Sequence, residues 1–445
     1  MDQIPGYIAN FFASIFGSLY TNFSSYVPQG TGKIILIGLI LFLVVGTGVY
    51  LSSQKTEGQI KSDQNTILGG IMDSIAQTRK GVDAYLSEKL VQESRNNWVL
   101  FNFAPLTIYD AGYMGPGVDG IYDKQAISRA LDMGFRCFIF HIDMYEGPAK
   151  DPNLFVPPGE PCLLHRDDQG VIRSRNCGKI EDMMEALGQQ AFSPSMATGD
   201  DPLIVILDFK NIPDRAKDES KYFSFLSRVA EKIQPLSKTF LDRLGESRFS
   251  MMENPGLLFT QNFQALKKRT LIFTNVNTDI FTGPRANNLS MDKNLRRWIH
   301  AQIYSLSSDA IPRDPVTDVV PKGGIMTVGR QNASYLLMTP PDKIKDAQLK
   351  TNNVYTLINP PEAFGNFKKD DVTSLMDKYG AQMVVFQPFV SPKETEDYFA
   401  GWGPYSWKLK PKDIQYVVVK AAPPKPISPR ADANGGNVAP PALHF

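Results

Sequence analysis

The chain has 445 residues, 42% hydrophobic and 21% charged, which is ordinary for a folded protein and long enough for one large domain with additions. Its 47 basic and 46 acidic residues leave a net charge of +1, and no cluster of Lys and Arg interleaved with aromatic residues occurs, so nucleic-acid binding is not expected. The three cysteines are too few for a disulfide framework and form no zinc pattern; Cys162 and Cys177 flank one loop, and their pairing stays open.

The first 54 residues contain the features of a membrane anchor. Residues 34–52 (IILIGLILFLVVGTGVYLS) carry no charge, which predicts a transmembrane helix over residues 33–54 rather than a buried core helix. A cleaved signal peptide fits less well, because the run begins far from the N-terminus and no basic region precedes it. In residues 1–32, aromatic and aliphatic residues recur on one helical face, which predicts an amphipathic interfacial segment, with packing on protein as the alternative.

The charges around this run predict how the protein is oriented. Basic residues are more numerous after the run than before it, so the positive-inside rule predicts a single-pass membrane protein with its C-terminal domain on the cytosolic side. Residues 55–95 place apolar residues at helical intervals and predict a helical stalk. The tail, residues 421–445, is rich in Pro, Ala and Gly and is expected to be disordered.

Residues 96–420 alternate short apolar runs with helical patterns, which predicts an α/β domain with a parallel sheet. The strand candidates are WVLFNF, FRCFIFHID, PCLLH, PLIVILDF, RTLIFTN, GIMTV, NVYTLI, AQMVVFQ and IQYVVV. This number of strands is typical of a (β/α)8 TIM-like barrel. A doubly wound sheet is the structural alternative, although no Gly-rich phosphate loop accompanies these strands.

Three successive strand candidates end in ionisable residues. FRCFIFHID ends in His141 and Asp143, PCLLH ends in His165, and PLIVILDF carries Asp208 near its end. Because strand side chains alternate between faces, these residues share the inward face, and barrel active sites lie at the C-terminal strand ends. A lone histidine in such a place is more often a satisfied polar group. Three strand ends in succession favour a site in one cavity.

The same segments resemble the X region of phosphoinositide-specific phospholipase C. HIDMYEGP is similar to the family's Glu-Leu-Asp-Cys-Trp-Asp-Gly-Pro run, with His141 in place of the Glu and Asp143 in place of the Asp. LLHRDD places His165 at the family's second histidine, and DPLIVILDFK places Asp208 at a later Glu. The resemblance covers residues 98–411 and implies a barrel in which two histidines and a calcium ion promote phosphoinositide cleavage.

The chain departs from the family where that chemistry needs specific groups. Ala111 and Gly112 stand in place of the family's His-Asn pair, and no other histidine precedes His141. Among the implied calcium ligands, His141 and Asp208 replace two glutamates, and only Asp143 is unchanged. Calcium prefers six to eight oxygen ligands, so a family-like calcium site is not expected. Losing a positioned acid–base or charge-stabilising group costs about 10²–10⁴-fold in rate.

Together these features predict a membrane-anchored phospholipase C X-like barrel without family-like catalysis, a pseudoenzyme with a structural, scaffolding or lipid-binding role. The implied partners are a lipid membrane, phosphoinositide headgroups and proteins of a membrane or virion assembly, since large DNA viruses encode barrels similar to this family. No organic cofactor is expected.

Two other functions remain open. One is an active metal-dependent phosphodiesterase, with His165 as general acid or base and His141, Asp143 and Asp208 around Mn, Fe or Zn. The other is a barrel used only for protein contacts.

Overall fold

The computed structural model describes residues 57–88, 98–115, 119–146, 157–167, 169–241, 257–306, 312–313, 328–351, 354–360 and 366–417. The chain divides into two compact units, residues 1–69 and 70–445. The predicted interfacial segment, transmembrane helix and C-terminal tail lie outside the described residues. Among the helices that are described, none combines the length and apolarity needed to cross a bilayer.

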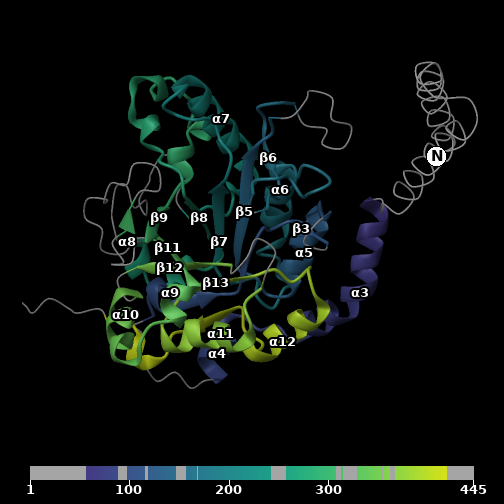
Figure 1. The fold of residues 1–445 in the computed structure, drawn as a ribbon, viewed down its shortest axis with the longest axis vertical. Helices are drawn as coiled ribbons and strands as arrows, with labels where there is room; N and C mark the ends of the chain where they lie inside the picture. The colour runs from purple at the N-terminus through teal and green to yellow at the C-terminus, as the bar shows by residue number, and fades with distance from the viewer. Residues whose placement is uncertain are drawn as a thin grey trace, which may run out of the picture. The chain divides into compact units, whose positions relative to one another are not determined.

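Within the described part of the second unit, eight parallel strands close into a barrel (Figure 1). Closure is achieved by β13, which pairs in parallel with β2. The predicted TIM-like barrel is therefore confirmed, and the doubly wound alternative is wrong, because that sheet would stay open. Around the barrel the strands are β2 (Thr107–Ile108), β5 (Cys137–Met144), β7 (Leu203–Phe209), β8 (Thr270–Thr274), β9 (Ala301–Leu306), β11 (Val328–Asn332), β12 (Tyr355–Asn359) and β13 (Met383–Phe386).

Three strand candidates do not enter the barrel. WVLFNF forms a short helical turn and then β1 (Phe103–Pro105), which pairs antiparallel with β14 (Trp407–Leu409). PCLLH contains β6 (Pro161–Leu163), which pairs antiparallel with β5 outside the barrel. The described part of IQYVVV contains no strand. These segments are apolar because they pack against the outside or the end of the barrel, and an apolar run does not distinguish that packing from a barrel strand.

Two barrel strands were not predicted, and both have weak sequence patterns. β2 has only two residues, and β9 (AQIYSL) interrupts its apolar residues with Gln302 and Ser305. β11 begins at Val328, the last residue of the predicted GIMTV strand. The remaining paired segments are β10 (Pro312–Arg313), which extends β9, and the hairpin of β3 (Tyr113–Met114) and β4 (Ile121–Tyr122).

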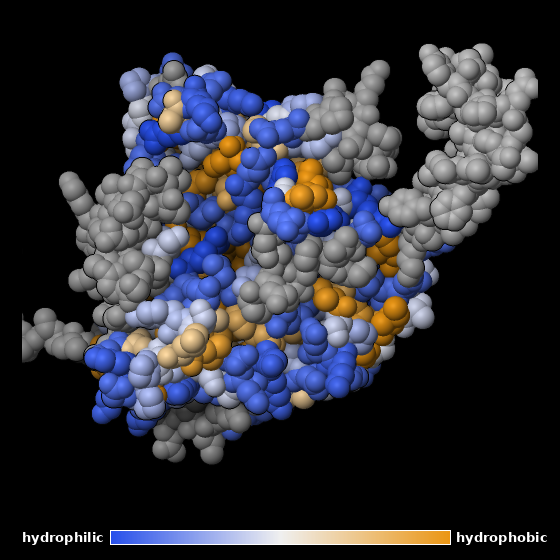
Figure 2. All heavy atoms as spheres, viewed as in Figure 1, coloured by the Kyte–Doolittle hydropathy of each residue, from blue (hydrophilic) through white to orange (hydrophobic). Residues whose placement is uncertain are grey.

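Helices connect these strands, and local sequence explains where they begin. The Asp123 side chain accepts a hydrogen bond of 2.8 Å from the Gln125 N–H and so caps α5. Hydrophilic residues cover most of the described face in Figure 2, with hydrophobic residues in smaller groups. The helices are α3 (Glu57–Gln77), α4 (Val82–Glu88), α5 (Lys124–Asp132), α6 (Ile180–Gln190), α7 (Glu219–Lys232), α8 (Leu257–Thr260), α9 (Ala333–Leu337), α10 (Ile344–Thr351), α11 (Lys369–Thr373) and α12 (Pro392–Trp402).

A buried carboxylate joins the beginning of the second unit to its end. Asp201, 2% exposed, accepts a hydrogen bond of 3.1 Å from the Val82 N–H at the start of α4 and another from the Ser406 hydroxyl beside β14. The Lys80 N–H also donates to the Pro404 carbonyl at 2.9 Å. Part of the predicted stalk, from residue 70 to residue 88, thus belongs to the same compact unit as the barrel.

Candidate active site

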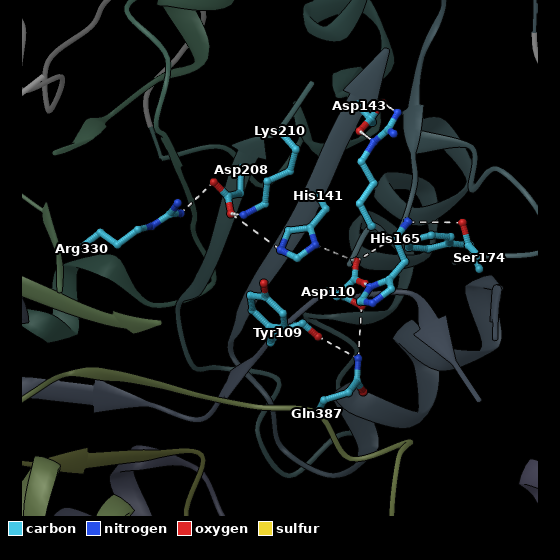
Figure 3. Close-up of polar contacts among 12 residues, drawn as sticks. Tyr109, Asp110, His141, Asp143, His165, Ser174, Asp208, Lys210, Arg330 and Gln387 are labelled. Atoms are coloured by element: carbon cyan, nitrogen blue, oxygen red, sulfur yellow. Dashed lines mark hydrogen bonds and ion pairs between the residues drawn. The ribbon is translucent and has the colours of Figure 1, made fainter. Parts of the chain in front are cut away.

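The C-terminal ends of β5 and β7 place His141 beside Asp208. These two residues are register partners in the parallel pairing, and His141 Nε2 lies 3.7 Å from Asp208 Oδ2. Both side chains are buried. Figure 3 shows His141 at the centre of the polar side chains, with Asp208 on one side and Asp110 on the other.

Two cationic side chains hold Asp208. Lys210 Nζ, just after β7, lies 2.7 Å from Oδ2, and a terminal nitrogen of Arg330, on β11, lies 2.7 Å from Oδ1. Burial alone would raise the pKa of Asp208, but Arg330 and Lys210 hold it well below its ordinary value, so the carboxylate is ionised at neutral pH. The Lys210 side chain is 35% exposed and that of Arg330 is 18% exposed, whereas the Asp208 side chain is 2% exposed. The cations, rather than the carboxylate, therefore face the solvent.

A guanidinium holds the second predicted carboxylate. Arg166 Nε donates to Asp143 Oδ2 at 2.6 Å, and a terminal nitrogen of Arg166 donates to Oδ1 at 2.8 Å. This bidentate geometry gives strong, charge-assisted hydrogen bonds. Burial raises the pKa of Asp143, and the hydrogen bonds from Arg166 offset only part of that effect. Asp143 has no exposed surface, so Arg166 provides its charge compensation.

Asp110, which follows β2, belongs to the site although the sequence pattern does not predict it. His141 Nδ1 lies 3.3 Å from its Oδ1, and His165 Nδ1 makes a close hydrogen-bonded contact with its Oδ2. The Tyr122 hydroxyl donates to Oδ1 at 2.5 Å. Asp110 has a φ of 50°, in the left-handed region that non-glycine residues seldom adopt. The signal for it is an aspartate two residues after a barrel strand, but the sequence pattern does not reveal the short strand β2.

The surroundings of Asp110 favour its charged form. Burial opposes that charge, but the two imidazoles and the hydrogen bonds from His165 and Tyr122 hold the pKa of Asp110 below its ordinary value. Burial lowers the pKa of His141 to about 4, so this imidazole is neutral at pH 7. The Tyr113 ring stacks on His165, with ring centroids 4.6 Å apart. His165 is thus oriented by a carboxylate at Nδ1 and by an aromatic ring on its face.

Ala111 and Gly112, which replace the His-Asn pair of the resemblance, bring no polar side chain to the site. Ala111 is fully buried, and Gly112 has a φ of 92° that favours glycine. The residues just before them contribute instead: Asp110 contacts both histidines, and the Tyr109 ring lies edge-on to His141, with centroids 4.5 Å apart. The end of β2 therefore carries ionisable and aromatic groups, but none is a histidine.

A cavity of about 700 Å³ opens beside these residues. Its wall includes Tyr109, His141, Arg166, Lys210 and Arg330, with Glu146 and Asp167 as its acidic members. His165, Asp143 and Asp208 are not part of this wall, so the four predicted residues do not all line one cavity.

Another hollow, of about 850 Å³, lies over α9 and α10. Its wall includes Lys343 and Asp346 but no group of converging charges. The barrel mouth is therefore the better candidate site.

The predicted metal set of His141, Asp143 and Asp208 does not fit a divalent cation. Each of the two carboxylates is already paired with one or two cationic side chains. The remaining ligand, an imidazole, is a poor partner for calcium, which prefers oxygen atoms. These residues therefore do not fit the calcium site that the resemblance implies.

A different set of residues is better arranged to hold a metal ion. Asp110, His141 and His165 are all buried, and one ligand atom from each lies within 4.8 Å of the others. A set of two imidazole nitrogens and one carboxylate oxygen suits Zn, Mn or Fe better than calcium.

No protein-family model and no curated protein matches the chain. Similar solved structures include PLC21 from L. pealei, at 15% identity and a TM-score of 0.46. The matched region covers 71% of this chain and 38% of the PLC21 chain. A calcium-dependent phosphoinositol-specific phospholipase C from Pseudomonas sp. has 12% identity and a TM-score of 0.41, and the match covers 72% of this chain and 100% of the Pseudomonas chain. A glycerophosphodiester phosphodiesterase from Parabacteroides distasonis has 11% identity and a TM-score of 0.33, and the match covers 67% of this chain and 97% of the Parabacteroides chain. The Pseudomonas protein is of the kind that the sequence resembles, whereas the third is a glycerophosphodiester phosphodiesterase, and all three are similar to this chain in fold alone.

Replacing Arg166 with methionine should destabilise the protein at pH 7, because it leaves the buried Asp143 carboxylate unpaired. We expect a loss of about 1–3 kcal/mol in the free energy of unfolding. Without Arg166 the pKa of Asp143 in the folded protein rises further above its value in the unfolded chain. The penalty is therefore present at pH 7 and shrinks as the pH falls toward 4 and the carboxyl group becomes protonated. Denaturant unfolding of the purified full-length protein at both pH values measures this.

Arg175→Met is the matched control. Arg175 is as exposed as Arg166, but its partner Asp119 lies 4.0 Å away and is 65% exposed. The control should change stability by less than about 0.5 kcal/mol. A loss in R166M that is equal at pH 7 and pH 4 would show that Asp143 is not the group left unpaired.

Proposed function

We propose that the mouth of the barrel binds the phosphate-bearing headgroup of a phosphoinositide-like lipid, and that it does not cleave this lipid at the rate of a phospholipase C. One observation carries the proposal: cationic side chains of the cavity wall, not free ligand positions for a metal, surround Asp143 and Asp208. The positive charge presented to a phosphate is therefore guanidinium and ammonium.

Lys210 and Arg330 are the groups best placed to bind the phosphate. Together they bring two positive charges to the single negative charge of Asp208, which leaves one excess positive charge among these three residues. Arg330 has five N–H donors, and its Nε has no hydrogen-bond partner among the described residues. The cavity volume of about 700 Å³ lies within the usual range for small-ligand sites, and a headgroup would fit.

The same residues argue against efficient cleavage. Where the resemblance needs a histidine and an asparagine, the chain has Ala111 and Gly112, and neither offers a group that stabilises developing charge. With the implied calcium site also lost, the acceleration left to the remaining groups is small, even though such losses do not simply multiply. A lipid-binding or scaffolding role in a membrane requires neither the family's His-Asn pair nor a calcium site.

Lys210→Met and Arg330→Met should each weaken the binding of myo-inositol 1-phosphate, used as a soluble probe, by about 10-fold or more, because each removes a charge-assisted hydrogen bond. Titration calorimetry on the full-length protein measures the affinity. Lys217→Met is the matched control, since Lys217 is a lysine paired with an aspartate, Asp214, and is 84% exposed. Unchanged affinity in both site variants, or undetectable binding by the unmodified protein, would contradict the proposal.

Metal-dependent phosphodiester cleavage is a second candidate function, and the contacts of Asp110 favour it. Asp110 orients His165 through Nδ1, which is the arrangement of a general acid or base held by a carboxylate. Asp110, His141 and His165 also form the set of possible ligands suited to Zn, Mn or Fe. In this function His165 would move the proton, and a bound metal would polarise the phosphate.

The two functions make opposite predictions for turnover. We expect the full-length protein to release no inositol phosphate from phosphatidylinositol vesicles above background when calcium, manganese or zinc is supplied. Calcium should be ineffective in particular, because the predicted carboxylate ligands are paired with cationic side chains. Release that requires manganese or zinc and disappears in His165→Ala would establish cleavage as the function.

We also propose that residues 33–54 span a membrane and hold the barrel on its cytosolic side, near lipid headgroups. The support is the uncharged sequence and the excess of basic residues after it. The full-length protein should stay in the membrane pellet after alkaline carbonate extraction. Release of the protein into the supernatant would show that this segment does not span the bilayer.

A further inference from the structure

Two cysteines lie together outside the charged site. The Sγ atoms of Cys162, on β6, and Cys177 are 3.6 Å apart, and both cysteines are free thiols. Cys162 belongs to a small buried cluster with Tyr145 and Leu164, against which Cys177 packs. We refer to residues 162–178 as the thiol loop; this segment leaves β6, carries His165 and returns to the start of α6.

We propose that Cys162 and Cys177 are a redox-active thiol pair that becomes a disulfide by exchange with a low-molecular-weight disulfide such as oxidised glutathione. The sulfur atoms must approach from 3.6 Å to the disulfide bond length of about 2.05 Å. The backbone beside both cysteines is already fixed, since Leu163 and Gly178 exchange two hydrogen bonds of 2.9 Å. Closing the bond therefore requires side-chain rotation more than loop rearrangement.

The difference in exposure between the two thiols sets the order of the chemistry. Cys177 is partly exposed, whereas Cys162 is 2% exposed. The hydrogen bond with Cys177, and then burial, raise the pKa of the Cys162 thiol, which makes it a poor first nucleophile.

The exchange proceeds in two balanced steps. The Cys177 thiolate attacks one sulfur of oxidised glutathione, forms a mixed disulfide and releases one glutathione. Cys162 then loses its proton, attacks the Cys177 sulfur and releases the second glutathione. The protein gives up two electrons and two protons, and oxidised glutathione becomes two reduced molecules.

The thiol loop contacts the site at its base. A Cβ added at Gly178 would lie 2.7 Å from the Tyr122 Cβ, so the loop backbone is pressed against Tyr122. The Asn176 side chain also exchanges hydrogen bonds of 2.7 and 3.0 Å with the Tyr122 backbone. Tyr122 in turn donates to Asp110. A disulfide at the base of the loop would therefore fix the segment that carries His165 and Arg166 against the residue that holds Asp110. Formation of this disulfide does not require phosphate binding at the barrel mouth.

The test uses the full-length protein, incubated with reduced or oxidised glutathione, alkylated under denaturing conditions and digested for mass spectrometry. We expect oxidised glutathione to give a linked Cys162–Cys177 peptide, while Cys137 remains alkylated. In Cys162→Ser, the remaining Cys177 should retain a glutathione adduct, because the second thiol is missing. Cys137→Ala is the control and should form the linked peptide at the unmodified rate.

A second measurement separates a specific pair from chance oxidation. A native disulfide closing this loop should raise the thermal midpoint of the oxidised protein by roughly 5 °C relative to the reduced protein. A persistent glutathione adduct on Cys177 of the unmodified protein, without the Cys162–Cys177 link, would overturn the proposal. So would a linked peptide accompanied by a lower thermal midpoint, since the bond would then strain the fold.

Discussion

The candidate site depends on the parallel register between β5 and β7. This pairing runs from Cys137 with Ile204 to Ile142 with Phe209, and it brings His141 directly opposite Asp208 at the carboxyl end of the barrel. A shift of one residue would place His141 opposite an apolar residue and turn the ionisable groups of one strand to the wrong face. The apolar side chains that fix this register are therefore as important to the site as the residues that line its cavity.

Burying carboxylates at that edge requires nearby positive charge, and the barrel supplies it from Arg166, Lys210 and Arg330. The same three side chains are part of the cavity wall. In the proposed function, charge compensation within the fold and recognition of an anionic ligand would use the same atoms. A bound phosphate would share its donors with the carboxylates rather than meet free cations, which favours moderate affinity. It also means that the barrel needs no metal ion to present positive charge at its mouth.

The sequence predicts the fold well where burial on both faces leaves a long apolar run, as in β5 and β7, and it predicts the placement of His141 and Asp208 with them. It fails where a strand is short: β2 has two residues, so Asp110 just after it goes unnoticed. PCLLH is apolar because β6 packs outside the barrel, and its pattern cannot distinguish the two settings. The pairing of Asp208 with Arg330 is a contact between distant strands, and no local pattern encodes it.

Asp201 gives the second unit an unusual mechanical property. Its carboxylate ties the start of α4 to the segment beside β14, so a part of the chain near the beginning of the unit meets a part near its end. A force applied to the chain before Asp73 would first load the ion pair of Asp73 with Arg129 on α5, whose atoms are 2.7 Å apart, and then the hydrogen bonds of Asp201 and the neighbouring Lys80–Pro404 contact. Tension at this end is therefore shared among contacts of α3, α4 and the segment beside β14, none of which is a pairing contact of β5 with β7.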